Sequence, residues 1–512
     1  MDPIFVLATL GRAGMLRPGS PVRVARQVGA LRRWGYGLAG ELRSAAARSP
    51  DRVAVIDERG ELTYAALLDR AERLAWALRR DLGMAAGDRL GILCRNGSGL
   101  VEGAAAAGLL GADAVLVNTG LSAPQLAAVV QEQRVKAVLH DSDLPGVPDA
   151  VPHLDEVRVE RLIATSPAGA LRPPEREGRT VVLTSGTTGV PKGARRPTPP
   201  GLRPLASVIS RVPLRVGERM MVAAPLFHTW GYGTLQIALA LRATMVLRRR
   251  FGAADTLRAV TERRCTALFV VPVMAQRILE LPAVPTPLRI VAVSGSALPG
   301  GLAHRFMDAY GDILYSLYGT TEASWASIAT PAELRQAPET AGRPPHGTRV
   351  AVLDAAGAPL PPGRVGRVFV GNEMLFDGYT SGAGRESRHG LLSTGDLGHL
   401  DSSGLLFVAG REDDMIVSGG ENVFPAEVEN LLADLPEVRE VAVVGVPDPE
   451  YGQRLAAYLV LRDGATLDPE AVRQHVRAHR ARFCVPRDVV FLDALPRNAT
   501  GKVVPRELPG PQ

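Results

Sequence analysis

Apolar strand-like runs alternate with helical segments along most of the chain, and this alternation restricts the fold more than any other feature. A strand-like run over residues 87–94 precedes an alanine-rich helical pattern over 101–111, and a second run over 113–118 precedes another helical pattern over 123–133. The same order returns between residues 256 and 319. Strands that alternate with helices are typical of parallel α/β sheets. We therefore expect an α/β protein whose large N-terminal domain contains two α/β layers.

The pattern changes toward the C-terminus. Short strands separated by Gly/Pro turns over residues 340–410 predict a β-rich subdomain, and the last hundred residues predict a small α+β domain. A chain of 512 residues is too long to fold around one core. We expect a basic N-terminal arm over residues 1–49, a large domain over residues 50–411 and a C-terminal domain over residues 414–512.

Positive charge is concentrated near the N-terminus. The formal net charge is +6, and residues 1–50 contain eight arginines but only two acidic residues. The rest of the chain is balanced, so the charge gives no indication of a nucleic-acid partner. Within residues 12–34, Val24, Val28 and Leu31 share one helical face. Two interpretations stay open: this helix packs on its own domain, or it contacts an anionic membrane surface.

The sequence favours a cytoplasmic protein. Its start lacks the basic leader of a secretory signal, and no uncharged stretch reaches the length of a bilayer. The three cysteines, Cys94, Cys265 and Cys484, are widely separated and odd in number. This usage fits a reducing compartment and provides neither a disulfide framework nor a zinc-binding pattern.

Lysine is rare, and its positions indicate where chemistry is expected. Only three of the 59 basic residues are lysines, and two of them, Lys192 and Lys502, lie in glycine-containing motifs. The third, Lys136, precedes a short apolar run and is expected to be a surface charge. An ammonium group is a compact charge on a flexible stem, so it can follow a moving phosphate or carboxylate better than the wide guanidinium fork of arginine.

The first lysine motif has the character of a phosphate-binding loop. The string TSGTTGVPKG, residues 184–193, follows an apolar strand. Glycines let backbone amides approach phosphate oxygens, hydroxyl groups add donors, and lysine adds charge. The string is not the common P-loop, because Gly193 follows Lys192 where that motif requires serine or threonine. The phosphates of a nucleoside triphosphate are expected to contact Thr184, Ser185, Gly186, Thr187, Thr188, Gly189 and Lys192.

Five motifs occur in a fixed order. They are TSGTTGVPKG, YGTTE (residues 318–322), STGD (393–396), GREDD (410–414) and PRNATGK (496–502). In these motifs the chain resembles the adenylate-forming (ANL) superfamily of acyl- and aryl-CoA ligases, luciferases and nonribosomal adenylation domains, and it looks most like bacterial fatty-acyl-CoA synthetases. The resemblance implies that the protein uses ATP and Mg²⁺ to convert a carboxylic acid into acyl-AMP and pyrophosphate, and then passes the acyl group to CoA.

The resemblance also implies roles for individual residues. Lys502 would bridge the carboxylate and the α-phosphate, Thr321 would contact the α-phosphate, and Glu322 would hold Mg²⁺, which binds carboxylates together with phosphate oxygens. His228 would gate or position the substrates where acid and pantetheine meet. The remaining AMP contacts would come from Ser294, Gly295, Ser296, Ala297, Tyr318, Gly319 and Thr320 around adenine, and from Asp396 and Arg411 at the ribose.

The transfer to CoA is expected to use a mobile C-terminal domain that rotates after adenylation. Cys484 stands where related ligases usually carry a lysine, so the CoA site has lost one charge. The residues implied by the resemblance are Asp413 as the hinge, Gly419 and Gly420 in the pantetheine channel, and Tyr451, Phe483 and Arg487 at the CoA nucleotide.

The acid and the acceptor are the least determined features. The expected acid pocket is apolar, lacks a countercharge for an amine, and is formed by His228, Trp230, Leu317, Ala323 and Trp325. The overall resemblance favours a fatty acid. An alternative keeps the adenylation but passes the activated acid to an amine, a hydroxyl or a carrier-protein thiol, or activates a non-carboxylate such as nitrite. The oligomeric state stays open between a monomer and a homodimer.

Overall fold

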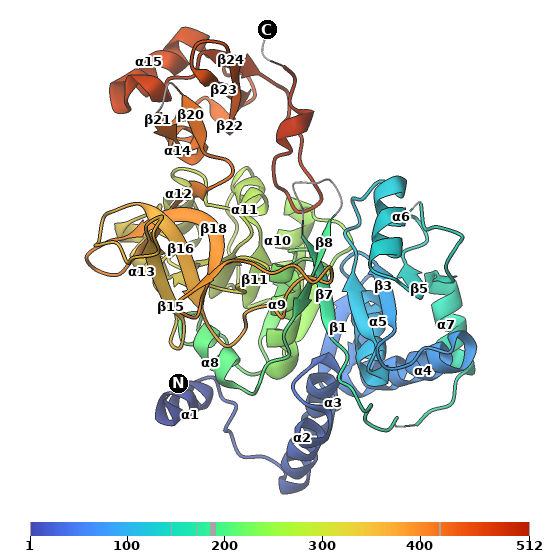
Figure 1. Ribbon diagram of the computed structural model, residues 1–512. Helices are drawn as coiled ribbons and strands as arrows, with labels where there is room; N and C mark the ends of the chain where they lie inside the picture. Colours follow the sequence, from blue (N-terminus) through green and yellow to red (C-terminus); the bar gives the residue numbers. More distant parts are fainter. Residues whose placement is uncertain (1, 145, 170, 185–190, 419–420, 511–512) are drawn as a thin grey trace.

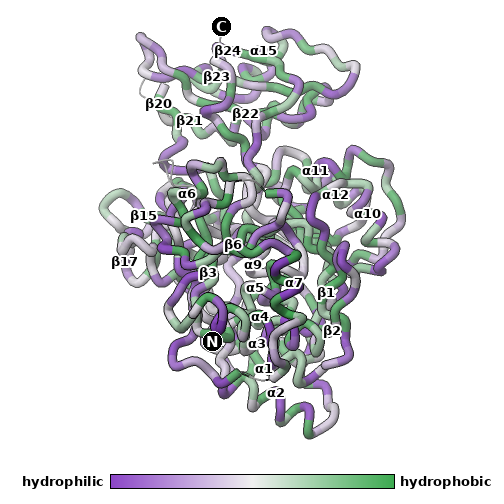
Figure 2. Tube along the Cα trace, turned by 90° about the vertical axis from the view of Figure 1, so that its right-hand side faces the viewer, coloured by the Kyte–Doolittle hydropathy of each residue, from purple (hydrophilic) through white to green (hydrophobic). Residues whose placement is uncertain are grey.

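The computed structural model describes residues 2–144, 146–169, 171–184, 191–418 and 421–510. Within these residues the predicted fold class is confirmed. Two sheets of mainly parallel strands and a β-rich unit form a large body, and a small α+β unit stands at its C-terminal end (Figure 1). A view from the side shows the same separation (Figure 2). The expected phosphate-loop residues Ser185 to Gly189 and the expected channel residues Gly419 and Gly420 lie outside the described residues.

The first layer is a six-stranded sheet with the order β6-β5-β3-β4-β7-β8, in which the β7–β8 pair is antiparallel. The apolar helix α5 is buried on nearly all sides, and its one acidic side chain, Glu102, is paired with Arg70 at 2.6 Å. The elements are β3 (Arg89–Leu93), β4 (Asp113–Leu116), β5 (Ala137–His140), β6 (His153–Leu154), β7 (Thr180–Thr184), β8 (Lys192–Arg196), α4 (Tyr64–Leu82), α5 (Ser98–Leu110), α6 (Ala123–Glu132) and α7 (Glu156–Thr165).

The second layer is an eight-stranded sheet with the order β14-β13-β12-β11-β9-β10-β1-β2. Its central strands are short apolar runs buried on both faces, as parallel sheets covered by helices require. The elements are β1 (Val53–Asp57), β2 (Gly60–Thr63), β9 (Arg219–Val222), β10 (Thr244–Leu247), β11 (Ala267–Val270), β12 (Ile290–Val293), β13 (Leu314–Tyr318), β14 (Ser327–Ala329), α8 (Arg203–Ile209), α9 (Thr229–Ala240), α10 (Ala253–Glu262), α11 (Pro272–Leu279), α12 (Leu302–Tyr310) and α13 (Pro331–Gln336).

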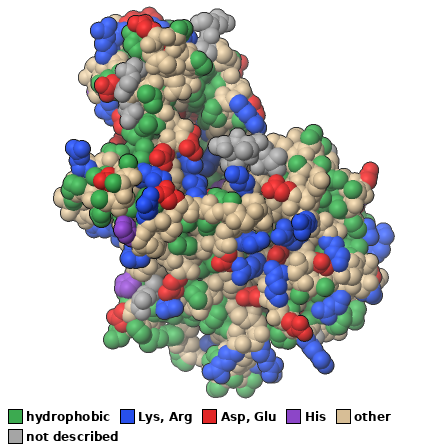
Figure 3. Space-filling view, viewed as in Figure 1, with side chains coloured by type: hydrophobic (Ala, Val, Ile, Leu, Met, Phe, Trp, Pro, Cys, Tyr) green, Lys and Arg blue, Asp and Glu red, His purple; other side chains and the backbone are tan. Residues whose placement is uncertain are grey.

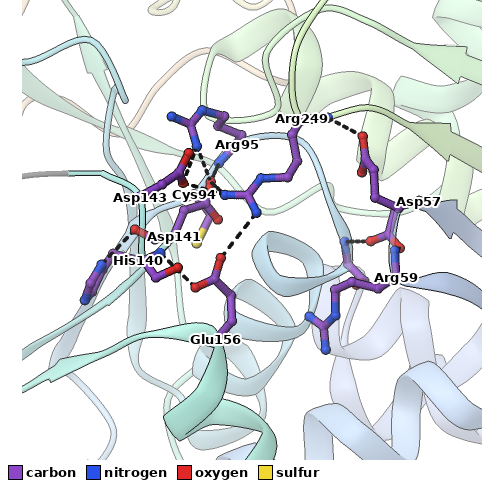
Figure 4. A network of polar contacts seen from close by, with 12 residues as sticks. Asp57, Arg59, Cys94, Arg95, His140, Asp141, Asp143, Glu156 and Arg249 are labelled. Carbon is purple, nitrogen blue, oxygen red and sulfur yellow. Dashed lines mark hydrogen bonds and ion pairs between the residues drawn. The ribbon is translucent and has the colours of Figure 1, made fainter.

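The two layers are joined by one apolar core and by an ionic network. Leu90 and Leu100 of the first layer and Met220 and Leu247 of the second belong to the same buried cluster. In the network, Arg249, which follows β10, reaches the carboxylates of the first layer (Figure 4). Its Nη2 lies 3.2 Å from Asp141 and 2.7 Å from Asp143, and its Nη1 lies 3.4 Å from Glu156. These contacts fix the relative position of the strand ends.

Antiparallel structure follows the two layers. The β-rich unit contains β15 (Arg349–Leu353), β16 (Gly366–Gly371), β17 (Ser387–Arg388), β18 (Leu391–Leu400) and β19 (Leu406–Arg411). The C-terminal unit has its own sheet and its own apolar core. It contains β20 (Ile416–Ser418), β21 (Glu421–Val423), β22 (Val438–Asp448), β23 (Gly452–Leu461), β24 (Asp488–Phe491), α14 (Pro425–Ala433), α15 (Pro469–His479), and the short 3₁₀ helices η1 (Arg482–Cys484) and η2 (Pro505–Glu507).

The first 49 residues divide into a surface helix and parts of the core. They form α1 (Pro3–Arg12), α2 (Pro21–Trp34) and α3 (Leu38–Arg48). Leu42 of α3 is fully buried and belongs, with Leu10 of α1, to the large core cluster. α2 has no buried residue and packs against α3. No helix in the described part of the chain is long and apolar enough to cross a membrane.

Candidate active site

A cavity of about 1520 Å³ lies between the large body and the C-terminal unit. In the space-filling view, basic and acidic side chains gather around the recess between these two parts (Figure 3). Several of the lining segments follow the carboxyl ends of parallel strands β12 and β13, where ligands of open α/β sheets usually bind. The expected site residues in its wall are Thr184, Lys192, His228, Trp230, Ser294, Gly295, Ser296, Ala297, Leu317, Tyr318, Gly319, Thr320, Thr321, Glu322, Trp325, Asp396, Arg411, Asp413 and Lys502.

Asp396 lies at the centre of a small polar cluster. β18 and β19 pair so that Asp396 stands opposite Arg411, whose Nη1 is 3.8 Å from Asp396 Oδ1. The Tyr318 hydroxyl, at the end of β13, donates to Asp396 Oδ2 at 2.5 Å. Burial raises the pKa of Asp396, while the hydrogen bond from Tyr318 and the charge of Arg411 oppose that shift. The cluster therefore presents a buried acceptor for hydroxyl donors beside an aromatic ring.

Glu322 is buried and held by two residues that the sequence analysis did not identify. The hydroxyl of Tyr379 donates to Glu322 Oε1, and Arg385 Nε lies 3.7 Å from the same oxygen. The described residues contain no cluster of three or more His, Cys, Asp or Glu side chains that could hold a metal alone. A single carboxylate in the wall of an ATP-sized cavity fits Mg²⁺, because this ion usually takes its other ligands from water and phosphate oxygens.

Thr321 is fixed from two sides. Its Oγ1 lies 2.8 Å from Thr229 Oγ1, and its backbone carbonyl accepts a hydrogen bond from Arg196. Arg196 also donates to the hydroxyl of Ser324. Burial lowers the pKa of Arg196 to about 10. This arrangement ties the loop that carries Thr321 and Glu322 to the β8 strand.

His228 precedes α9 and faces the position of Lys502. Burial, with a further contribution from the charge of Lys502, lowers the pKa of His228 to about 4. The imidazole is therefore neutral near pH 7. A neutral ring at this place can position a substrate, but it does not supply a charge.

Lys502 reaches the cavity on a tight loop of the C-terminal unit. Asn498 Oδ1 accepts hydrogen bonds from the backbone amides of Thr500 and Lys502, both at 3.0 Å. The loop rests on the large body, where Ala499 lies against Gly120 and Gly501 lies against Val273. The side chain of Lys502 is in contact with solvent in the cavity. The protein around it still removes part of its hydration, and this desolvation, together with the charge of Arg411, lowers the pKa of Lys502. Nearby carboxylates, including Asp396 and Glu322, oppose that shift.

The residues expected at the CoA nucleotide lie away from this cavity. Tyr451 and Phe483 are 37% and 40% exposed on the C-terminal unit. The Arg487 guanidinium lies 4.3 Å from the centroid of the Tyr451 ring, and its Nη1 is 3.3 Å from Asp448 Oδ2. Cys484 is buried, and burial raises the pKa of its thiol. The stacked pair is thus an exposed aromatic and basic surface.

The tryptophans of the expected acid pocket do line the cavity, whereas Ala323 does not. Trp230 Nε1 donates to the carbonyl of Val270 at 3.0 Å, and Trp325 Nε1 donates to Thr348 Oγ1 at 3.0 Å, so both rings are fixed. Ala323 is fully buried in a separate cluster with Val368 and Leu406. Its side chain turns under the β-rich unit, because the chain reverses direction directly after Glu322.

The sequence model of the AMP-binding enzyme family matches residues 42–380, and that of the AMP-binding enzyme C-terminal domain matches residues 427–502. Together they cover more than half of the chain. The chain belongs to the AMP-binding enzyme family. The resemblance to the ANL superfamily and to bacterial acyl-CoA synthetases is thereby confirmed.

Individual relatives of this AMP-binding enzyme are CoA ligases. A feruloyl-CoA synthase of Amycolatopsis sp is 33% identical over 479 residues, covering 90% of this chain and 96% of the relative. An indoleacetate–CoA ligase of Aromatoleum aromaticum is 32% identical over 482 residues, covering 89% of this chain and 94% of the relative. A solved o-succinylbenzoate CoA synthetase of Bacillus subtilis, bound to its acyl-adenylate, is 29% identical with a TM-score of 0.82, covering 92% of this chain and 98% of that one.

These findings place the AMP-binding enzyme among AMP-forming acid–CoA ligases, and they correct one expectation. The prediction of a fatty-acid substrate was wrong, since the relatives are named for feruloyl, indoleacetate and succinylbenzoate groups. The cavity gives a physical reason. Its wall carries two fixed tryptophans and the buried carboxyl group of Glu41, which a long alkyl chain would leave without a hydrogen-bond partner.

Proposed function

We propose that this AMP-binding enzyme joins an aryl carboxylic acid to ATP, giving aryl-AMP and pyrophosphate, and then transfers the aryl-acyl group to CoA. The observation that carries the proposal is the single cavity in which Lys502, Thr321 and Asp396 meet two fixed tryptophans. The flat tryptophan rings suit a planar acid. The feruloyl and indoleacetate ligases among the relatives, whose named acids are aromatic, support the same substrate class.

In the first half-reaction, two anions must be brought together. The acid would lie beside Trp230 and Trp325, with its carboxylate directed toward His228 and Thr321. Lys502 would contact both the carboxylate and the α-phosphate as the new P–O bond forms, and Lys192 would contact the outer phosphates. Donors and cations that are already in place stabilise the charge that develops in the transition state.

The adenosine part would be held by the cluster around Asp396. The carboxylate of Asp396 would accept hydrogen bonds from the ribose hydroxyls, with Arg411 beside it, and adenine would stack on Tyr318. The segment from Ser294 to Ala297 would form the other wall. Tyr379 and Arg385 would hold the carboxylate of Glu322 in the orientation in which it ligates Mg²⁺. When bound there, Mg²⁺ would neutralise charge on the phosphate oxygens.

The second half-reaction would require the C-terminal unit to rotate about Asp413. Lys502 would leave the cavity, and Gly419 and Gly420 would line the pantetheine channel. Tyr451, Phe483 and Arg487 are exposed on the unit that moves, and their aromatic and basic character suits a nucleotide. The CoA thiol would then attack the carbonyl carbon of aryl-AMP, and AMP would leave. The use of ATP and CoA supports the cytoplasm as the compartment.

A second candidate replaces CoA by another nucleophile. The fold is also similar to that of an amide bond synthetase from Marinactinospora thermotolerans, with 28% identity, a TM-score of 0.80 and coverage of 92% of this chain and 99% of that one. Cys484 replaces the lysine that related CoA ligases usually carry. The acceptor could be an amine or a carrier-protein thiol in place of CoA, and nitrite could take the place of the acid. Each of these alternatives would use the same residues to bind ATP.

Pyrophosphate release with a panel of acids, measured with and without CoA, tests these functions. The proposal predicts release with aryl acids and a CoA thioester of the same acid as the product. Release with aryl acids that never yields a thioester would favour the second candidate, and amines would then be tested as acceptors. Release with fatty acids only would refute the aryl-acid proposal.

Contact with a membrane is a separate proposal for α2. α2 exposes Val22, Val24 and Val28 together with the arginines Arg23 and Arg26. This pattern suits weak binding to an anionic surface, although α2 also packs against α3 as the alternative interpretation predicts. Co-sedimentation with anionic vesicles, but not with neutral ones, would support the contact. Equal recovery in both supernatants would exclude it.

A further inference from the structure

Glu41 is a buried carboxyl group that the proposed mechanism does not use. It lies on α3, is 7% exposed, and lines the same cavity as the catalytic candidates. Its Oε2 has no hydrogen-bond partner among the described residues. Burial raises the pKa of Glu41 well above its usual range. A buried polar atom without a partner is destabilising, and because Glu41 also lines the cavity, a bound ligand can supply that partner.

The cavity continues from the reaction centre along one face of α9. Beyond Thr229, its wall is formed by residues of α9 at spacings of three and four, which lie on one side of a helix. Residues of α8 and of the segment before it also line the cavity. The α9 residues are Gly233, Gln236, Ile237 and Ala240, and the residues of the α8 region are Leu202, Pro204, Leu205 and Val208. Apart from Gln236, all of these side chains are apolar or absent.

The length of this slot suits an aryl acid. A helix rises about 1.5 Å per residue, so the seven steps from Thr229 to Gln236 span about 10 Å. This is comparable to the distance between the carboxylate of a cinnamate-type acid and the substituent at the far side of its ring. A planar acid that enters with its carboxylate at Thr229 would therefore bring its opposite end to the level of Gln236.

Glu41 lies beside this inner part of the slot. α3 packs against α9 (Figure 1). Tyr232 and Gln236 stand one helical turn apart on α9, and the pKa of Tyr232, raised to about 12 mainly by burial, also responds to Glu41. Arg196 is another buried charged residue of the wall, but it carries only donors, and its two Nη atoms already donate to Thr321 and Ser324. The free acceptor near the inner end is thus Glu41.

We propose that Glu41 is a specificity-determining residue, which accepts a hydrogen bond from an O–H or N–H group carried by an aryl acid at the end remote from its carboxylate. Gln236 provides a second polar group in the same wall. The inference rests on the proposed function and narrows its substrate class to acids such as hydroxy- or amino-substituted cinnamates. A second carboxylate at that end is disfavoured, because it carries no hydrogen-bond donor of its own and only one of two acidic groups can be charged in a dry environment.

The test compares two acids that differ by one hydroxyl group, 4-hydroxycinnamate and cinnamate. Pyrophosphate release gives kcat/KM for each acid with the wild type, Glu41→Gln, Glu41→Leu and Glu41→Met. The two apolar variants should lower kcat/KM for 4-hydroxycinnamate by about 10- to 100-fold, and they should leave the value for cinnamate unchanged or higher. Glu41→Gln should keep most of the preference, because its amide oxygen still accepts a hydrogen bond.

Glu72→Gln is the matched control. Glu72 is also a buried glutamate near α3, but it pairs with Arg43 and does not line the cavity. The ratio of the two kcat/KM values should stay at its wild-type level in this variant. Because the ratio is internal to each preparation, partial unfolding of a variant does not change it.

An unchanged ratio in both Glu41→Leu and Glu41→Met would overturn the inference, and so would a wild-type preference for cinnamate or for an aryl dicarboxylic acid. These results differ from a failure of the proposed function. If the proposed function were wrong, the wild type would release no pyrophosphate with any aryl acid. The ratio of kcat/KM for 4-hydroxycinnamate to kcat/KM for cinnamate could then not be measured.

Discussion

Replacing Lys502 with alanine removes the ammonium group that the C-terminal unit delivers to the cavity. Its charged surroundings are Asp396, Asp414, Glu322 and Arg411. In the proposed mechanism this ammonium contacts the carboxylate and the α-phosphate most strongly as charge develops between them. Loss of one such contact lowers kcat by about 10²- to 10³-fold, or about 3–4 kcal/mol. KM for ATP should change by only a few-fold, because Lys192 and Asp396 remain.

The assay is pyrophosphate release at saturating ATP and 4-hydroxycinnamate. Lys136→Ala is the matched control, since Lys136 Nζ contacts the Gly83 carbonyl and Asp88 Oδ2, both at 2.7 Å, and does not line the cavity. This control should release pyrophosphate at the wild-type rate. Lys502→Ala should still form thioester from purified aryl-AMP and CoA, because Lys502 has left the cavity in that step. Pyrophosphate release by Lys502→Ala within threefold of wild type would refute the assigned role.

Three further predictions follow from the same site. Asp413→Pro should spare pyrophosphate release and stop thioester formation. The Asp413 amide makes no backbone hydrogen bond among the described residues, so proline would restrict only the rotation of the C-terminal unit. Equal loss of both activities would contradict the assignment of Asp413 as the hinge. Tyr379→Phe should raise the Mg²⁺ concentration for half-maximal rate by about tenfold, because Glu322 loses its hydroxyl donor, and an unchanged Mg²⁺ titration would contradict this. The pKa of His228 in the folded protein, about 4, lies below its ordinary value of 6.5, so the unfolded state takes up a proton first as the pH falls. The stability should therefore decrease as the pH is lowered from 6.5 to 4. His228→Asn should flatten that part of a thermal-melting profile against pH, whereas a profile parallel to wild type would contradict the assignment.

The sequence predicted the fold class, and most of the described residues that it marked as candidates for nucleotide binding line one cavity, because strand and helix patterns and motifs are encoded locally. Short buried strands and helical periodicity determine the two layers. Motif residues such as Thr321, Asp396 and Lys502 are marked by their neighbours in the chain, and the fold brings them to one cavity.

The features that were missed depend on contacts between distant segments. Tyr379 and Arg385 meet Glu322 across more than fifty residues of chain, and neither belongs to a recognisable motif. Glu41 lies in a segment that composition alone indicated as a basic arm, although α3 is part of the core. Ala323 was assigned to the pocket by its position next to Glu322, but a reversal of the chain directs its side chain elsewhere.

The acid was misjudged for a related reason. Trp230 and Trp325 suit both a flat acid and the wall of an alkyl tunnel, and adjacent sequence does not distinguish the two. The distinguishing group, Glu41, comes from a separate part of the chain and is recognisable only once the fold places it in the wall of the same cavity.

The central claim is that a carboxylate oxygen of the acid attacks the α-phosphate of ATP. An aryl acid labelled with ¹⁸O in both carboxylate oxygens tests this directly, with ATP and CoA unlabelled and the products analysed by mass spectrometry. Attack on the α-phosphate followed by transfer to CoA predicts one ¹⁸O in AMP and one in the thioester. Label in inorganic phosphate, or AMP without label, would contradict the account.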